Sequence, residues 1–293
     1  MFIDIHAHAC RIPGFPSGGK PYMVTTDQLL ARHEAIGVER AVLLPIVSSE
    51  SAYFTQANED IIEMSRRHPD RFIPFCNVDP RFMTYSVDAP LGQMLRYYQE
   101  QGCKGIGEVT ANLPFSNDMV QNLFKHAEAA GLPVLFHMAP RIGSTYGLYD
   151  EPGMPQLEMS LRRFPKLPFL AHSTTFWAEM APLETPADRY GYPRYPIRAE
   201  GVVPKLMRRY RNLLGDLSAG SGHNALARDR DYAVQFLAEF QDQLFFGLDI
   251  CAPDTPTPLV DLLLDLRSKG KISDAVFNKI ARENAARLLG VAR

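Results

Sequence analysis

Eight apolar, strand-like runs alternate with helical segments along the chain, and this alternation constrains the fold more than any other feature. The runs lie at residues 2–8, 40–47, 71–78, 102–109, 132–138, 167–172, 212–217 and 244–250. Because each run is almost continuously apolar, we expect a parallel sheet that is covered on both faces. Eight strand–helix units in one chain predict an α/β fold whose sheet closes into a (β/α)8 TIM barrel.

Helical patterns occupy most of the intervals between these runs. Thr25 and Gln28 form a capping-box pattern at the start of the first helix, and Gly37 marks its end. The predicted helices span 25–37, 88–101, 116–131, 154–164, 202–210, 229–241, 258–269 and 273–289. Residues 58–68 are predicted to form the last part of a further helix. An open, doubly wound sheet is the alternative, but no Gly-X-Gly-X-X-Gly follows the first strand, which disfavours it.

The composition is that of an ordinary globular protein. The 293 residues are 46% hydrophobic and 22% charged, with a net charge of −2, and their number suits one barrel domain over 1–293. No basic block or stripe of one charge indicates a nucleic-acid partner, and no apolar run is long enough for a membrane span. The first strand begins at residue 2 with no signal peptide before it, so we expect a cytoplasmic protein with four reduced, scattered cysteines.

The first strand carries two histidines, His6 and His8, in the run Asp4-Ile5-His6-Ala7-His8. Residues i and i+2 of a strand point to the same face, so the two imidazoles project side by side. Imidazole is the commonest metal ligand among protein side chains. Two hydrogen-bonded structural histidines would give the same pattern. The residues at the other strand ends therefore have to distinguish a metal-binding pair from a structural one.

Other polar side chains end the later apolar strands. They are Glu108 on the fourth strand, His137 on the fifth, His172 on the sixth and Asp249 on the eighth. Singly, each has a structural explanation: Glu108 as an ion-pair partner, Asp249 as a helix cap, either histidine as a satisfied core residue. Because the carboxyl ends of barrel strands meet at one mouth, we expect these side chains to converge there with His6 and His8. Such a set of nitrogen and oxygen donors suits Zn²⁺, Mn²⁺ or Fe²⁺.

Several segments of the chain together resemble a known family. The pieces Asp4-Ile5-His6-Ala7-His8, Phe136-His137, Ala171-His172, Phe246-Gly247-Leu248-Asp249 and the stretch from Glu283 to Gly290 resemble the amidohydrolase superfamily of metal-dependent barrels. Within it, the chain is similar to the amidohydrolase-related branch that holds aminocarboxymuconate-semialdehyde decarboxylase, resorcylate-type decarboxylases and lactone hydrolases. The matching pieces span the whole length.

The resemblance implies roles for the converging residues. His6, His8, His137 and Asp249 would hold one metal, with zinc the first choice and manganese or iron the alternatives. His172 would be a catalytic histidine in members with one ion, or a ligand of a second ion in members with two. Glu108 would bridge the ions in a two-metal member, and we include it in the ligand set.

The predicted mouth carries further candidates for substrate binding. Arg11 and Arg141 follow strand ends and could clamp a carboxylate, although loop arginines are more often solvated. Trp177 could form an apolar wall, or it could serve ordinary packing. His223 could face the substrate, although a helix-entry role for Ser221 or Asn224 is the plainer account of its segment. Two long connections, 10–24 and 173–201, follow strands and are expected to set specificity. Cys10 and Cys251 are expected near each other at the rim as reduced thiols.

These residues predict a metal-dependent hydrolase that cleaves a C–O or C–N bond of a small carboxylated or cyclic substrate. Asp249 would take a proton from the attacking water, and His172 would polarise a carbonyl or stabilise the oxyanion. A metal-dependent, non-oxidative decarboxylase of an aromatic or muconate-like acid is the alternative, although Ser173-Thr174-Thr175 after His172 favours the hydrolase. A metal-free or non-catalytic barrel is the third possibility. A small molecule is the expected partner, and a homodimer the expected assembly.

Overall fold

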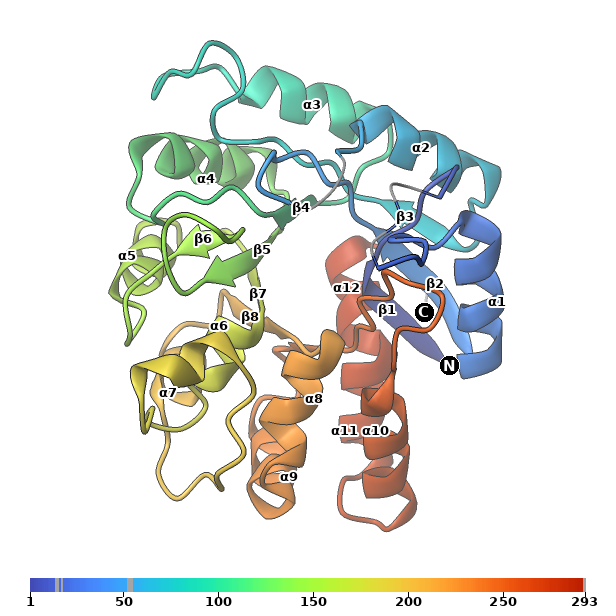
Figure 1. Ribbon diagram of the computed structural model, residues 1–293, viewed down its shortest axis with the longest axis vertical. Coiled ribbons are helices and arrows are strands. Elements are labelled where there is room, and N and C mark those ends of the chain that lie inside the picture. Colours follow the sequence, from blue (N-terminus) through green and yellow to red (C-terminus); the bar gives the residue numbers. More distant parts are fainter. Residues whose placement is uncertain (14–15, 17, 52–54, 292–293) are drawn as a thin grey trace.

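The computed structural model describes residues 1–13, 16, 18–51 and 55–291. Its strands are β1 (Phe2–Ala7), β2 (Val38–Leu43), β3 (Phe72–Pro74), β4 (Ile106–Val109), β5 (Val134–Ala139), β6 (Leu148–Tyr149), β7 (Phe169–His172), β8 (Leu213–Asp216) and β9 (Leu244–Phe245). They form two parallel runs in the order β1-β2-β3 and β4-β5-β7-β8-β9, and β6 pairs with β5. The helices surround the strands (Figure 1).

Two isolated parallel bridges close the barrel. Cys76 pairs with Ile106 between the ends of β3 and β4, and Ala7 pairs with Ile250, which lies beyond β9. The amide of Ile5 also donates to Phe246 O at 3.0 Å, and the amide of Asp249 donates to His6 O at 2.9 Å. The predicted TIM barrel is therefore confirmed, with its first and eighth strands joined next to the metal-ligand candidates.

The helices have the following bounds: α1 (Thr26–Ile36), α2 (Asn58–Arg67), α3 (Gly92–Glu100), α4 (Asp118–Ala130), α5 (Pro155–Arg163), α6 (Thr174–Ala178), η1 (Pro186–Tyr190), α7 (Val202–Arg209), α8 (Ala219–Ala227), α9 (Arg230–Glu239), α10 (Pro258–Ser268), α11 (Asp274–Asn278), η2 (Lys279–Glu283) and α12 (Asn284–Leu289). The capping box of α1 forms as predicted, because the side chains of Thr25 and Gln28 each accept from the other's backbone amide. Gly37 ends this helix with a φ of 85°, a conformation that glycine adopts without steric cost. None of the described helices combines the length and the apolar character that a membrane crossing needs.

The barrel interior is filled by apolar side chains below the predicted mouth. Ile3 and Ile5 of β1 pack with Phe75, Leu135 and Leu170 from strands around the barrel. The β1–β2 register shifts between Asp4 and Ala7, and Ala7 packs with the outer core under the helices. After this shift His6 and His8, rather than Ala7, continue the inward-facing row.

Several elements lie where loops were expected. The connection 173–201 begins with α6, whose first turn is capped by Ser173 Oγ accepting from the amide of Phe176, and it also holds η1. The small residues after β8 form α8, and the last predicted helix, 273–289, is divided by the π-helical turn η2. Part of the connection 10–24 lies outside the described residues, namely Gly14, Phe15 and Ser17.

Candidate metal and active site

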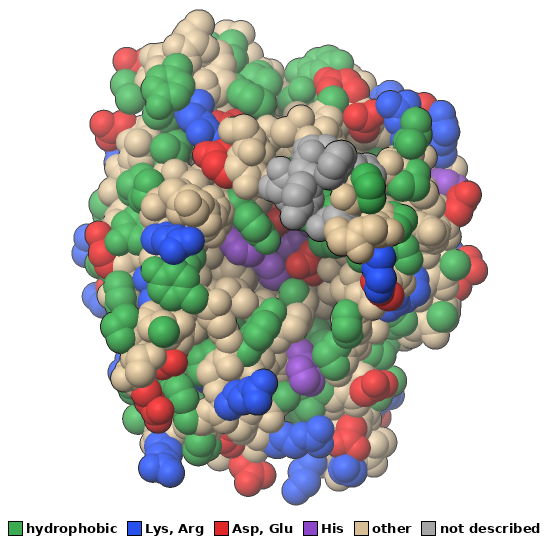
Figure 2. Space-filling model, viewed as in Figure 1, with side chains coloured by type: hydrophobic (Ala, Val, Ile, Leu, Met, Phe, Trp, Pro, Cys, Tyr) green, Lys and Arg blue, Asp and Glu red, His purple; other side chains and the backbone are tan. Residues whose placement is uncertain are grey.

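The polar residues predicted at the strand ends come together at one mouth of the barrel. His6 and His8 come from the end of β1, Glu108 from β4, His172 from β7, and Asp249 from the segment after β9. Figure 2 shows histidine and acidic side chains in a hollow near the centre of the face viewed. Four overlapping groups of three donor residues lie there, each with ligand atoms within 4.8 Å of one another.

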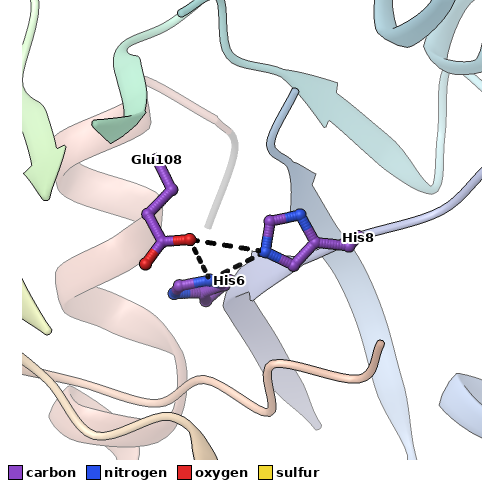
Figure 3. Close-up of side chains that lie close together, drawn as sticks. All are labelled: His6, His8 and Glu108. Atoms are coloured by element: carbon purple, nitrogen blue, oxygen red, sulfur yellow. Dashed lines mark hydrogen bonds and ion pairs between the residues drawn. The ribbon is translucent and has the colours of Figure 1, made fainter. Parts of the chain in front are cut away.

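Four of these residues have the spacing of a metal site. Nε2 of His6 lies 3.1 Å from Nε2 of His8, and Oε2 of Glu108 lies 3.7 Å from both nitrogens (Figure 3). Oδ1 of Asp249 lies 3.5 Å from Nε2 of His6 and 3.6 Å from Nε2 of His8. A tetrahedral zinc site with ligand bonds near 2.1 Å has ligand–ligand distances of about 3.4 Å. The four donor atoms therefore suit a divalent ion.

The hydrogen bonds of the two imidazoles provide an independent test of this fit. Nδ1 of His6 lies 2.7 Å from Oδ2 of Asp216, and Nδ1 of His8 lies 3.1 Å from Leu44 O. A carboxylate and a carbonyl can only accept, so both Nδ1 atoms carry the proton. In the neutral rings the two Nε2 lone pairs then face each other, between two carboxylates. A cation at their centre satisfies all four donors, and the partners of Nδ1 orient each ligand ring.

The charges of the site also indicate that it attracts a cation. Burial disfavours protonated His6, but the carboxylates of Asp249 and Asp216 outweigh it and raise the pKa of His6 to about 10. Burial disfavours ionised Glu108, yet the hydrogen bond from His137 and the charge of His6 hold the pKa of Glu108 well below its ordinary value. Without a metal, this buried carboxylate cluster therefore attracts a proton to its most enclosed imidazole.

Asp249 touches three of the imidazoles and a thiol. Besides its contacts with His6 and His8, its Oδ2 lies 3.7 Å from Nε2 of His172. Its Oδ1 accepts from the thiol of Cys251 at 3.2 Å, and burial raises the pKa of that thiol well above its usual value. The backbone of Asp249 has a φ of 53°, a left-handed conformation that is uncommon outside glycine and that often occurs at functional sites.

His137 reaches the cluster through Glu108. Its Nδ1 lies 2.9 Å from Oε1 of Glu108, and its donor atoms group with those of Glu108 and His172 rather than with those of β1. Its place among the metal ligands remains a prediction.

Two buried residues at the end of β8, Asp216 and Ser218, were not predicted from the sequence. Oδ2 of Asp216 lies 2.7 Å from Nδ1 of His6 and 3.3 Å from Nδ1 of His172. Ser218 Oγ lies 2.9 Å from both that carboxylate oxygen and Nδ1 of His172. The sequence held a usable signal for Asp216, because it is an acidic residue near the end of the seventh apolar run. The same reasoning selected Glu108 and Asp249.

A small pocket opens above the cluster. Besides site residues, it is lined by Tyr22, Met23, Ile46, Ser51, Thr110, Tyr146 and Cys251. The ring of Tyr146 lies 4.4 Å from that of His137, between centroids. Burial and the charges of Glu108 and Asp249 raise the pKa of Tyr146, so its phenol keeps its proton. Cys251 packs against the small apolar group that contains Cys10, so the two cysteines lie near each other beside the pocket, as expected.

The structure places the other substrate-binding candidates away from this pocket. Arg11 pairs with Asp60 and Glu63 at the surface, and His223 lines a separate surface groove with Arg230. Arg141 is exposed and lies over the ring of Tyr190. None of the three lines the pocket: Arg11 and Arg141 lie in loops that carry them to the surface, and His223 lies in α8.

The structure places Trp177 in the core, where it serves packing, and not among the residues that line the pocket. It is only 1% exposed, and it packs against Phe176 and Phe236 in the outer core. Its indole N–H donates to Asp216 O at 2.9 Å. Trp177 therefore supports the end of β8 from behind.

The comparison with protein families agrees with this geometry. The amidohydrolase family model matches residues 3–291. The chain belongs to this family, and its fold is the family's TIM barrel. A search of curated proteins finds no significant match.

Solved structures share the fold at low sequence identity. One is an amidohydrolase from Burkholderia multivorans with bound zinc, at 14% identity, a TM-score of 0.64 and coverage of 100% of both chains. A second is 5-carboxyvanillate decarboxylase from Novosphingobium aromaticivorans with manganese and a nitrobenzoic acid, at 15% identity and a TM-score of 0.62, covering 99% of this chain and 96% of that one. A third is a probable 2-pyrone-4,6-dicarboxylic acid hydrolase from Acinetobacter baumannii, at 15% identity and a TM-score of 0.60, with 99% of both chains covered.

Proposed function

We propose that the protein is a metal-dependent hydrolase that cleaves a C–O or C–N bond, as in a lactone or an amide, of a small cyclic substrate. The observation that carries this proposal is the position of Asp249. One of its oxygens lies among the imidazole nitrogens of His6 and His8, and the other lies beside His172. A carboxylate placed between the metal donors and a second imidazole is suited to accept and return a proton.

The donor set favours zinc, with manganese or iron as alternatives, since nitrogen and oxygen ligands accept several of these metals. A divalent ion at these donors supplies the positive charge that acidifies a neighbouring water and polarises a carbonyl oxygen. Of the five predicted ligands, we propose that His6, His8, Glu108 and Asp249 hold one ion per chain. His137 would then act through its hydrogen bond to Glu108 instead of binding that ion. Oε1 of Glu108 is already engaged by His137, which leaves Oε2 for that ion.

The protein residues then divide the proton transfers. Asp249 accepts a proton from the attacking water and delivers it to the leaving oxygen or nitrogen, so that one water is consumed for each bond broken. Tyr146 lines the pocket and keeps its phenol proton, since its pKa is raised, so it can donate a hydrogen bond to a substrate bound there. Glu108 remains ionised and balances positive charge throughout.

The pocket favours a substrate whose carbonyl group is uncharged over a substrate that also carries a carboxylate. Among the described residues, those lining the pocket include no lysine or arginine, and the loop arginines Arg11 and Arg141 are directed elsewhere. A substrate carboxylate would therefore meet Glu108 and Asp249 without a side-chain cation beside it. Of the substrates considered from the sequence, we favour the cyclic ester or amide.

The test is a substrate screen with the zinc- and manganese-loaded protein in water enriched in oxygen-18. The panel pairs neutral lactones and cyclic amides with carboxylated counterparts, and includes aromatic acids followed by CO₂ release. We expect ring opening of a neutral member with one heavy oxygen incorporated. CO₂ release without incorporation of water would instead identify the decarboxylase and overturn the proposal.

A further inference from the structure

We infer that Ser218 and Asp216 are positioning residues that fix the tautomer of His172, so that its Nε2 faces Asp249 and the reacting water without a proton. The catalytic role that we assign to this tautomer rests on the proposed function. The arrangement itself follows from hydrogen bonds among buried side chains.

The direction of each hydrogen bond follows from Asp216, which can only accept. Ser218 Oγ lies 2.9 Å from Oδ2 of Asp216, so the single hydroxyl proton of Ser218 goes to this carboxylate. Nδ1 of His6 also lies 3.3 Å from Ser218 Oγ, but its proton goes to Asp216 at 2.7 Å. Ser218 must then accept from Nδ1 of His172, which lies 2.9 Å away. The proton of neutral His172 therefore resides on Nδ1, and Nε2 presents a lone pair.

The same carboxylate also holds His6. Oδ2 of Asp216 accepts from Nδ1 of His6 at 2.7 Å, and Oδ1 accepts from the amide of Ser218 at 2.9 Å. Neighbouring structure leaves room for this arrangement only because residue 247 is glycine. A Cβ there would lie 2.7 Å from Oδ1 of Asp216 and 2.8 Å from Cβ of Ser218. Asp216 thus orients a metal-ligand candidate and, with Ser218, a catalytic candidate.

This tautomer changes the role expected of His172. To polarise a carbonyl or stabilise an oxyanion, neutral His172 would need a proton on Nε2, and the network places that proton on Nδ1. With Nε2 bare, His172 accepts a hydrogen bond from the water that Asp249 deprotonates, and so orients the water for attack. No covalent bond to His172 forms, and the proton of the water still passes to Asp249.

The first test observes the tautomer directly. Long-range ¹H–¹⁵N spectra of the zinc-loaded, ¹⁵N-histidine-labelled protein report which ring nitrogen carries the proton, and a His172→Gln variant identifies the signals of His172 by their loss. We expect protonated Nδ1 in the wild type and a population protonated on Nε2 in Ser218→Ala. Protonated Nε2 in the wild type, or a Ser218→Ala spectrum identical to the wild type, would overturn the inference.

The second test is kinetic, with matched serine variants. Ser218→Ala should lower kcat about 10- to 100-fold, the usual effect of removing a residue that orients a site imidazole, with KM and zinc content within about twofold of wild type. Ser218→Thr keeps the hydroxyl and should recover most of kcat. Ser221→Ala is the control, since Ser221 is a buried serine of α8 whose hydroxyl donates to Ser218 O and not to the imidazoles or Asp216 among the described contacts. An unchanged kcat in Ser218→Ala, or an equal loss in Ser221→Ala, contradicts the inference.

The two tests separate this inference from the proposed function. If the expected tautomer is found but no substrate is hydrolysed, the network stands and the hydrolase proposal fails. If hydrolysis is found with protonated Nε2, the network fails and the hydrolase proposal stands. Should Ser218→Ala fail to fold, the wild-type spectrum and the Ser218→Thr variant still decide.

Discussion

The Nδ1–H group of His137 donates a hydrogen bond of 2.9 Å to Oε1 of Glu108, while Oε2 of the same carboxylate lies 3.7 Å from both imidazoles of β1. Glu108 therefore divides its two oxygens between a fixed hydrogen bond and the metal donors. A carboxylate held in this way orients one oxygen toward an ion.

Replacing Glu108 by glutamine tests this division. The Glu108→Gln substitution keeps the size of the side chain but removes its charge, so we expect about 10- to 100-fold weaker zinc binding with the fold retained. Titration with a competing chelator measures the affinity, and elemental analysis measures the number of ions. One ion per chain is expected in the wild type. Two ions in the wild type, with one lost in Glu108→Gln, would instead assign Glu108 as a bridging ligand.

Removal of the metal should destabilise the folded state. A ligand present at about 1,000 times its Kd stabilises a protein by roughly 4 kcal/mol, which corresponds to a loss of Tm on the order of 10 °C for a chain of this size. Thermal unfolding before and after chelation measures the shift, and adding zinc back should restore it. Equal Tm values for both forms would indicate that the donors hold no ion.

Replacing Asp249 by asparagine should remove activity while leaving the fold intact. The variant loses a metal donor and the proposed proton acceptor together, so kcat should fall by at least about 10²–10⁴-fold, the usual contribution of general acid–base catalysis. Circular dichroism checks the fold. Asp254→Asn makes the same chemical change at an exposed aspartate that pairs with Lys20, and it should behave as wild type. An active Asp249→Asn enzyme would mean that the site is wrongly assigned.

The stability of the metal-free protein should depend on pH with a defined sign. The pKa of His6 in the folded protein is about 10, against an ordinary value of 6.5. A pKa raised on folding adds stability that is complete below the unfolded value and is lost as pH rises through the folded value. The free energy of unfolding of chelated protein should therefore fall between about pH 6.5 and pH 10. Denaturant unfolding at several pH values measures it, and a rise over this interval would contradict the assignment.

Much of the fold could be predicted because a parallel barrel leaves a simple record in the sequence. Buried strands are continuously apolar, and polar residues at their carboxyl ends, such as Glu108 and His172, stand out against that background. The pairing of His6 with His8 followed from the strand period alone. The register shift in β1 that turns both side chains inward had no signal in the sequence.

Loop geometry was the part that could not be predicted. Arg11 and Arg141 follow strand ends closely, but their direction depends on pairing partners far away in the chain, such as Glu63 for Arg11. The short helices α6 and α8 depend on packing within the folded barrel, and α6 also on its Ser173 cap, because isolated segments of this length do not form stable helices. Trp177 was placed at the mouth because it lies in the connection after the sixth predicted strand, but that stretch forms α6, which buries the indole in the core.

The most direct test of the central claim is an anomalous-difference map from crystals of the zinc-loaded protein. We predict one peak within about 2.2 Å of Nε2 of His6 and of His8, with Glu108 and Asp249 completing the ligands. The absence of a peak among these four residues, or a peak bound only elsewhere, would contradict it.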